Sequence, residues 1–311
     1  MAAPLIAVVG PTASGKSALA LRLARERAGE IVSCDSLQVY RGLDIGTAKP
    51  TPEERRLVPH HLVDVAAPDE PFSAASYARR AREAVASIAR RDRLPLVVGG
   101  TGLYLKALLQ GLFEGPSRDE GLRARLERLA ERHGDSRLHR VLAGRDPEAA
   151  ARIGPRDRVR TVRALEVLLA TGRPISAHHR AGAEPLRGFR VLVIGLAPSR
   201  DELRRRVEAR TRGMLEAGLL DEIRRLLDAG YAEDLRPLRA IGYRQALAVL
   251  RGEMALAEAE ATIVTETMRF AKRQMTWFRH QADVAWYSDA DEAHHAVSTW
   301  LDTSKDHAAG P

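Results

Sequence analysis

Short apolar runs alternate with longer amphipathic stretches along most of the chain. Most of these runs lack polar alternation, which is typical of strands covered on both faces in a parallel sheet. The stretches between them repeat apolar residues at helical spacing. Strands alternating with helices predict an α/β fold, a doubly wound and mainly parallel sheet. The six expected strands are Leu5–Gly10, Glu30–Asp35, His61–Val65, Leu94–Gly100, Arg190–Leu196 and Ala282–Tyr287.

One interval, from Pro116 to Pro185, contains no strand-like run. The four helices predicted there are Asp119–Arg132, Ser136–Ala143, Pro147–Ile153 and Asp157–Thr171. We therefore expect a helical insertion at 118–185 and an α/β core made of 1–117 and 186–311. The helices expected in the core are Ser17–Arg27, Ala74–Arg90, Asp201–Met214, Glu216–Ala229, Tyr243–Leu250 and Met254–His280, and only the tail from Asp302 to Pro311 looks loose.

Composition narrows the class of protein. With 311 residues, 45% hydrophobic and 29% charged, the chain has the profile of a soluble globular protein. The single cysteine, Cys34, excludes a disulfide framework and any cysteine-based zinc module. No run approaches the roughly 18 apolar residues that a membrane span needs. We expect a cytoplasmic enzyme that does not contact a membrane.

The net charge of +8 favours a polyanionic partner such as nucleic acid. Residues 118–163 carry much of the excess, with 13 basic and 8 acidic residues. However, 44 of the 49 basic residues are arginine, which genome-wide codon bias explains equally well. Net charge alone therefore leaves the nature of the partner open.

A phosphate-binding loop is the strongest motif. The segment from Gly10 to Ser17 reads GPTASGKS and lies between an apolar strand and a helical pattern, as G-x-x-x-x-G-K-[ST] requires. Backbone N–H groups and the helix N-terminus there can hold a di- or triphosphate, and Lys16 adds a positive charge. The Ser17 hydroxyl can reach Mg²⁺. The expected phosphate-binding residues are Gly10, Pro11, Thr12, Ala13, Ser14, Gly15, Lys16 and Ser17.

The surroundings of this loop differ from those of an ordinary ATPase. Such enzymes place an aspartate after a later strand to organise Mg²⁺, but Leu94–Val98 is followed by Gly99, Gly100 and Thr101. This second glycine-rich turn can offer N–H groups and the Thr101 hydroxyl to the same anion, or it can be a plain tight turn.

Asp35 ends the second predicted strand, where the carboxyl ends of parallel strands line a ligand crevice. A carboxylate at that place can accept a proton from an attacking nucleophile. The alternative is that Asp35 only caps a local turn.

A basic stripe follows one side of the long C-terminal helix. At about 100° per residue, Arg269, Lys272, Arg273, Thr276 and His280 share one face, opposite an apolar face. No acidic residue lies between Thr267 and His280, whereas a merely solvated helix usually mixes both charges. The stripe therefore favours contacts with a phosphate backbone. In the insertion, Arg156, Arg160 and Arg163 form a similar stripe.

Seven segments resemble one family, the bacterial tRNA dimethylallyltransferases (tRNA isopentenyltransferases). The matching segments are Gly10–Ser17, Asp35–Tyr40, Asp44–Pro50 (DIGTAKP), Val98–Tyr104, Arg163–Val167, Ile241–Arg244 and Lys272–Arg279, and they occur in the family's order across about nine-tenths of the chain. The resemblance implies transfer of the dimethylallyl group from dimethylallyl diphosphate to N6 of adenosine 37, beside the tRNA anticodon. It also implies a monomer and a Mg²⁺ cofactor. Whether ATP also binds the loop stays open.

By the same resemblance, Asp35 is similar to the family's general base, and Thr101 to a residue that bonds the diphosphate near the breaking bond. Arg210 matches an arginine used on the diphosphate, although Arg212 lies nearby. The residues that would face the tRNA anticodon stem-loop are Asp35, Ser36, Leu37, Gln38, Thr101, Arg123, Val159, Arg160, Thr161, Val162, Arg163, Arg239, Ala240, Ile241, Gly242, Tyr243, Arg244, Lys272, Arg273, Gln274, Met275, Thr276, Trp277, Phe278 and Arg279.

Two other functions fit parts of the pattern. A P-loop small-molecule kinase would share the fold and use Asp35 on a substrate hydroxyl, but Thr101 stands where its magnesium-organising acid is expected. A non-catalytic RNA-binding switch that reads a bound nucleotide would need no base near the loop, so Asp35 counts against it.

Overall fold

The computed structural model describes residues 2–113, 115–116, 119–180 and 182–306. The chain divides into two compact units, one made of 1–109 with 186–311 and the other of Gln110–Pro185. The second unit begins before residue 118, the start expected from the sequence. Within the described ranges, no helix is long and apolar enough to cross a membrane.

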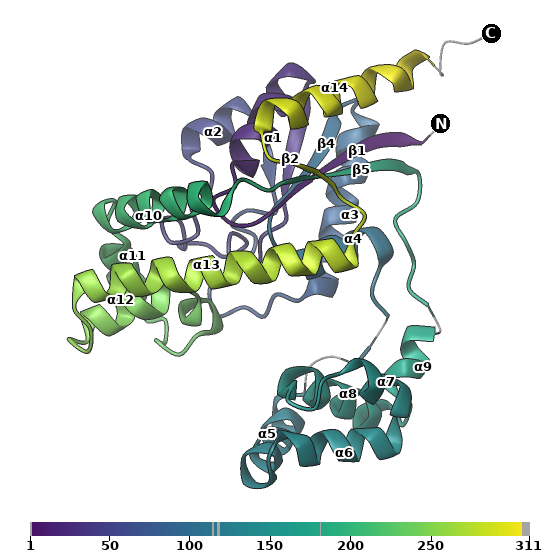
Figure 1. Cartoon of the computed structure of the whole chain (residues 1–311), viewed down its shortest axis with the longest axis vertical. Coiled ribbons are helices and arrows are strands. Elements are labelled where there is room, and N and C mark those ends of the chain that lie inside the picture. Colours follow the sequence, from purple (N-terminus) through teal and green to yellow (C-terminus); the bar gives the residue numbers. More distant parts are fainter. Residues whose placement is uncertain (1, 114, 117–118, 181, 307–311) are drawn as a thin grey trace. The chain divides into compact units, whose positions relative to one another are not determined.

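A six-stranded parallel sheet forms the centre of the first unit (Figure 1). This confirms the α/β fold that the sequence predicted. The strands lie in the order β3-β2-β4-β1-β5-β6. Their bounds are β1 Ala3–Val9, β2 Gly29–Ser33, β3 His60–His61, β4 Leu94–Val98, β5 Phe189–Leu196 and β6 Ala285–Tyr287.

Both faces of the sheet are buried, which explains why the strands lack polar alternation. On β1, Leu5 and Ala7 belong to one hydrophobic core, and Ile6 and Val8 belong to another on the opposite face. Successive side chains of a strand point to opposite faces, so a strand between two helical layers must be apolar throughout.

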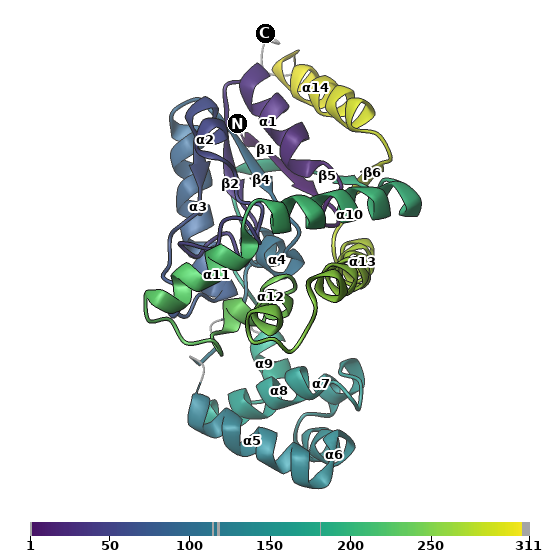
Figure 2. The ribbon, with the colours of Figure 1, turned by 90° about the vertical axis from the view of Figure 1, so that its left-hand side faces the viewer.

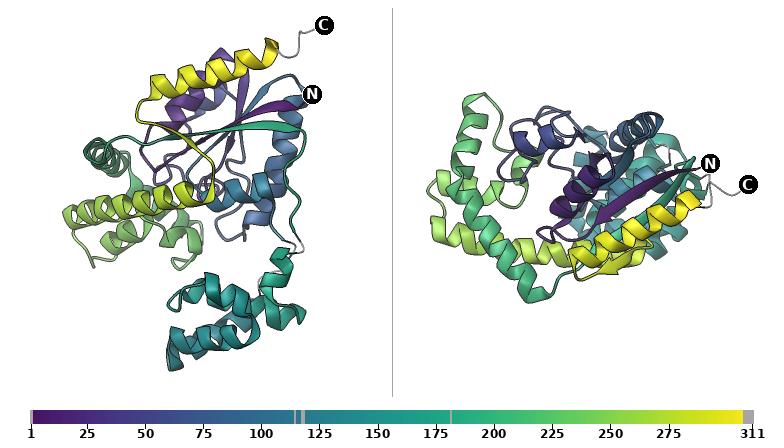
Figure 3. Two further views of the ribbon diagram at one scale, coloured as in Figure 1. Left: turned by 45° about the vertical axis from the view of Figure 1, so that its right-hand side comes forward. Right: turned by 90° about the horizontal axis from the view of Figure 1, so that it is seen from above.

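Helices cover both faces of this sheet. The helices of the first unit are α1 Lys16–Glu26, α2 Pro52–Leu57, α3 Ala74–Arg90, α4 Gly102–Gln110, α10 Arg200–Glu216, α11 Leu219–Asp228, α12 Tyr243–Leu250, α13 Leu256–Gln281 and α14 Ala290–Asp306, with a 3₁₀ turn at Arg236–Arg239. Helices α1 and α14 pack side by side on one face (Figure 3). Helices α3, α4, α11 and α12 contribute to the core of the other face, and α10 to α13 gather beside the sheet (Figure 2).

Several predicted elements were wrong in extent; β6 begins at Ala285 and not at Ala282, and α11 begins at Leu219 and not at Glu216. Of the expected strand His61–Val65 only His61 lies in β3, because Leu62 and Asp64 adopt positive φ angles of 60° and 59° that end the strand. The tail expected to be loose from Asp302 is helical through Asp306, because α14 buries Ala293 and Val297 against the sheet. Residues 307–311 lie outside the described part of the chain.

The second unit has a small core of its own. Its helices are α5 Glu120–His133, α6 Asp135–Arg145, α7 Pro147–Arg152, α8 Arg158–Thr171 and α9 Ile175–Arg180, the last of which the sequence did not predict. Buried carboxylates tie these helices together. Glu166 binds the Arg123 and Arg163 side chains, at 3.2 and 2.9 Å, and Asp146 accepts hydrogen bonds from the N–H groups of Ala149 and Ser176.

One edge of the sheet carries a buried carboxylate with cationic and histidine partners. Glu30 lies 2.7 Å from the His61 ring and 2.9 Å from the Arg91 guanidinium. Burial opposes ionisation of Glu30, but the hydrogen bonds from His61 and Arg91 outweigh it and hold the pKa of this carboxyl below its ordinary value. Its contribution to stability is therefore present above the unfolded pKa of about 4.3 and is lost as pH falls through the folded pKa.

We expect Glu30→Gln to lower the free energy of unfolding at pH 7 by about 1–3 kcal/mol, since it removes the buried anionic acceptor to which the His61 and Arg91 side chains bind. The difference from wild type should shrink as the pH is lowered below 4. Thermal unfolding of both proteins at several pH values measures this, and a difference that does not change with pH would contradict it.

Candidate active site

The loop between β1 and α1 has the geometry of an anion-binding site. Gly10 adopts φ +138°, where a Cβ atom would lie 2.5 Å from the carbonyl oxygen of Leu196. Helix α1 begins at Lys16 after Gly15, and neither a side-chain cap nor an acidic residue occupies its first turn. The first N–H groups of a helix lack intrahelical partners. This N-terminus can therefore donate to an anion.

Two side chains of the loop are placed to act on such an anion. Lys16 donates to the carbonyl oxygen of Pro11 at 2.5 Å, and Ser17 is exposed at the start of α1. Burial and the nearby charge of Arg210 lower the pKa of Lys16, the charge of Asp35 opposes them, and the resulting pKa is about 7. All three charged groups thus lie within electrostatic reach of one another.

A glutamine from α13 joins the two glycine-rich turns. Gln274 accepts a hydrogen bond from the Thr12 N–H at 3.0 Å and donates to the carbonyl oxygen of Gly100 at 2.9 Å. A Cβ atom on Gly100 would lie 2.2 Å from the Gln274 amide, and one on Gly102 would lie 2.1 Å from the Trp277 ring. These glycines are therefore required for the close approach of α13.

The second glycine-rich turn uses two of its N–H groups within the protein, which favours the plain tight turn that the sequence left open as an alternative. The N–H of Gly99 donates to the carbonyl oxygen of Val8, and that of Thr101 donates to the carbonyl oxygen of Cys34. The Thr101 hydroxyl accepts from the Ser36 N–H at 3.1 Å. The two backbone donors already have partners within the protein, because the turn closes over the end of β2.

Asp35 both caps a turn and faces a cavity. Its Oδ1 accepts hydrogen bonds from the N–H groups of Leu37 and Gln38, at 2.8 and 3.3 Å. This is the local cap that the sequence left open as an alternative. Oδ2 has no hydrogen-bond or ion-pair partner among the described residues. Capping through one oxygen therefore leaves the other available to accept a proton.

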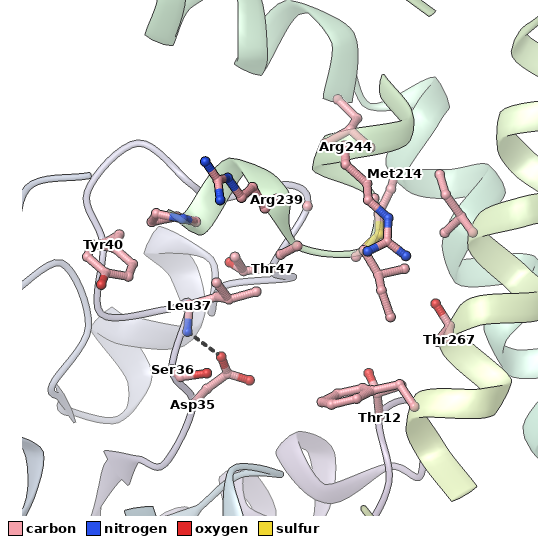
Figure 4. Close-up of a pocket in the computed structure, with 18 of the residues that line it drawn as sticks. Thr12, Asp35, Ser36, Leu37, Tyr40, Thr47, Met214, Arg239, Arg244 and Thr267 are labelled. Carbon is pink, nitrogen blue, oxygen red and sulfur yellow. Dashed lines mark hydrogen bonds between the residues drawn. The ribbon is translucent and has the colours of Figure 1, made fainter. Parts of the chain in front are cut away.

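A cavity of about 430 Å³ opens beside Asp35 (Figure 4). Asp35 and Thr12 line it, and Arg244 and Thr267 reach toward it from other segments (Figure 4). A second cavity of about 500 Å³ is lined by Ala13 to Ala18 of the phosphate loop. The residues that line the first cavity include Ser36, Leu37, Tyr40, Gly46, Thr47, Phe72, Tyr104, Arg210, Arg236, Arg239, Ala240, Ile241, Gly242, Phe270 and Arg273.

Arg210 lines both cavities and so joins the phosphate loop to Asp35. Its guanidinium donates to the carbonyl oxygen of Thr47 at 3.3 Å, and burial lowers its pKa. Arg212 instead lies beside Glu260, at 3.7 Å, with a side chain that is 64% exposed. Of the two arginines that the sequence proposed, only Arg210 lines these cavities. The sequence missed Arg206, one turn earlier on α10, which donates to the Ser14 carbonyl oxygen.

Several residues expected to face tRNA are buried instead. Thr161 and Val162 lie in the core of the second unit, and Tyr243, Gln274 and Phe278 lie in that of the first. Each of these residues belongs to a helix that packs on a core. Because a helix turns only one side outward, any continuous segment of it places some residues inward. The surface that remains includes Val159, Arg160, Arg239, Arg244, Lys272, Arg273, Thr276 and Arg279.

The exposed cations of α13 differ from three other exposed arginines that were expected to face tRNA. Arg160, Arg239 and Arg244 each have a carboxylate partner, Asp157, Asp234 and Glu266 respectively. Arg269, Lys272, Arg273 and Arg279 have no such partner among the described residues, and all four are exposed. Unpaired cations on one face of a helix are available to a polyanion.

Comparison with known proteins gives a consistent answer. The IPP transferase family model matches residues 38–281. The tRNA dimethylallyltransferase of Solibacter usitatus is 50% identical over 96% of this chain and 97% of its own, and that of Geobacter metallireducens is 52% identical over 91% of both.

Solved structures agree with this match. The tRNA isopentenylpyrophosphate transferase of Bacillus halodurans superposes with a TM-score of 0.70, 39% identity and 99% of both chains covered. A eukaryotic dimethylallyltransferase acting on tRNA gives 0.80 at 26% identity, over 98% of this chain and 80% of the other. The chain belongs to the IPP transferase family.

Proposed function

We propose that this enzyme transfers the dimethylallyl group of dimethylallyl diphosphate to N6 of adenosine 37 in tRNA. The observation that carries the proposal is the arrangement of two cavities around Arg210. The phosphate loop with Lys16 lines one, and Asp35 lines the other. A diphosphate in the cavity of the phosphate loop would direct its prenyl carbon toward a base in the cavity beside Asp35.

The bonds that form and break in this reaction, and the proton that is released, are all accounted for. The adenine N6 attacks C1 of the prenyl group, the C1–O bond breaks, and its electron pair leaves on the diphosphate. Oδ2 of Asp35 takes the proton from N6. Lys16, Arg210 and the N-terminus of α1 stabilise the charge that develops on the diphosphate.

A magnesium ion fits this site only together with its substrate. No cluster of three or more histidine, cysteine or carboxylate side chains that could hold a metal occurs in the described part. Mg²⁺ is often bound through one or two protein oxygens, phosphate oxygens and water. The Ser17 hydroxyl is exposed beside Lys16 and would be the protein ligand. When bound, the ion would supply positive charge to the leaving diphosphate.

The tRNA would lie along the unpaired cations of α13 and on the basic surface of the second unit. The target base must leave its stack to reach the cavity beside Asp35. Recognition of the surrounding stem would depend mainly on shape and phosphates.

The first test changes Asp35 to Asn. The Asn side chain keeps an oxygen for the Leu37 and Gln38 N–H groups but loses the basic oxygen. We expect the single-turnover rate of transfer to fall by about 10² to 10⁴, while binding of tRNA and of diphosphate survives. Near-normal turnover would refute the role of Asp35 as base. Phosphoryl transfer from ATP to any acceptor would overturn the transferase function itself.

The second test uses the pKa of Lys16, which is about 7 in the free protein. A bound diphosphate favours the charged amine, so the protein should take up a proton on binding at pH 8 and much less at pH 6. Calorimetric titration with dimethylallyl diphosphate in buffers of different ionisation enthalpy measures this uptake. Lys16→Met should lose the uptake and bind more weakly. Equal uptake by both proteins would contradict the assignment.

The third test removes two unpaired cations from α13. Lys272→Ala combined with Arg273→Ala should weaken tRNA binding at low salt and reduce its salt slope by about one unit per lost phosphate contact. The matched control is Arg204→Ala with Arg224→Ala, because both of these arginines already have carboxylate partners. An unchanged slope in the α13 variant, or an equal loss in the control, would exclude this surface.

A further inference from the structure

Helix α11 contains a buried carboxylate that the proposed reaction does not use. Glu222 is 2% exposed. Its oxygens accept hydrogen bonds from the N–H groups of Asp44, Ile45 and Gly46, at 2.9, 2.6 and 3.2 Å. They also accept one from the Tyr243 hydroxyl at 2.7 Å. In the described ranges no lysine, arginine or histidine forms an ion pair with Glu222.

A buried charge without a counter-ion is costly unless hydrogen bonds replace its hydration. Three consecutive backbone N–H groups form a concave donor site that suits an anion. Burial raises the pKa of the Tyr243 phenol, and the charge of Glu222 raises it further, so the phenol stays protonated and donates. The carboxylate is therefore held by four donors from two segments that are far apart in the sequence.

Both segments contribute to the wall of the cavity beside Asp35. Gly46 and Thr47 come from one segment, and Arg239 to Gly242 and Arg244 come from the other. The segments touch directly at Gly46, where a Cβ atom would lie 2.5 Å from the Tyr243 ring. Glu222 thus connects the two parts of the wall through a single side chain.

The same loop also determines the position of Arg210. The carbonyl oxygen of Thr47 follows directly after the residues that Glu222 binds. It accepts hydrogen bonds from Arg210 and from the Gln38 side chain, both at 3.3 Å. A shift of residues 44–46 would move this carbonyl oxygen and, with it, the guanidinium that lines both cavities.

We propose that Glu222 is a positioning residue, whose carboxylate holds the loop at residues 44–47 and the segment at residues 239–244 together, so that Arg210 meets the diphosphate and the cavity admits the adenine. The inference rests on the proposed function for its substrates. Glu222 itself touches neither substrate.

Two variants separate the two parts of this role. Tyr243→Phe keeps the three loop N–H bonds and removes only the link to residues 239–244. We expect the KM for tRNA to rise about tenfold, with the KM for dimethylallyl diphosphate within twofold of wild type. Glu222→Gln replaces an acceptor oxygen by an NH₂ group that faces N–H donors. We expect it to raise the KM for both substrates about tenfold or more.

Val297→Ala on α14 is the matched stability control, because it opens a small void in the core of the opposite sheet face. It should lower the Tm without changing either KM. The proposal is overturned if Glu222→Gln and Tyr243→Phe also lower only the Tm. If Glu222→Gln does not fold, Tyr243→Phe decides, because an unchanged KM for tRNA then refutes the proposal.

Binding of inorganic pyrophosphate separates this inference from the proposed function. Calorimetry should show weaker binding to Glu222→Gln than to Tyr243→Phe or wild type. If wild type transfers no prenyl group but this order of affinities holds, the reaction is wrong and the positioning role stands. If wild type is active and the three affinities are equal, the role in positioning Arg210 is wrong.

Discussion

Parallel pairing of all six strands is the constraint on which the site depends. In such a sheet the carboxyl ends of the strands meet at one edge, so the segments that follow β1, β2 and β4 must lie near one another. The phosphate loop, Asp35 and Thr101 are those segments. Since helices bury both faces of the sheet, this edge is where backbone donors and charged side chains can reach a ligand.

Side chains from later helices hold three loops together at that edge: the phosphate loop, the turn after β4 and the loop at residues 44–46. Gln274 bonds to the phosphate loop and to the turn after β4, and Glu222 bonds to the loop at residues 44–46. Both side chains are buried, and both come from helices late in the chain. Glycines at these contacts are needed because α13 and Tyr243 approach the backbone too closely for a Cβ atom. Much of the glycine content of the motifs therefore serves packing.

Some of the positively charged side chains are paired with carboxylates, and others are free to bind phosphates. Many exposed arginines already have a carboxylate within reach, such as Arg204 with Glu208, and such pairs add little attraction for a polyanion. The α13 cations lack such partners in the described part of the chain. In the phosphate loop, partial burial of Lys16 and the nearby charge of Arg210 lower its pKa, which favours its neutral form until an anion arrives. The unpaired cations of α13 and the Lys16 amine therefore remain available to phosphates.

Local pattern alone determined the α/β class, the phosphate loop, the position of Asp35 after β2 and the exposed stripe on α13, because each depends on periodicity or on neighbours within a few residues. Tertiary structure alone decided the rest. The turn at Leu62 shortens β3, and α14 is ordered by its contact with the sheet. The inward direction of Tyr243, the choice of Arg210 over Arg212 and the four bonds of Glu222 depend on segments separated by many residues along the chain. A sequence pattern holds no information on which distant donor a buried carboxylate meets, because that is settled only when the helices pack.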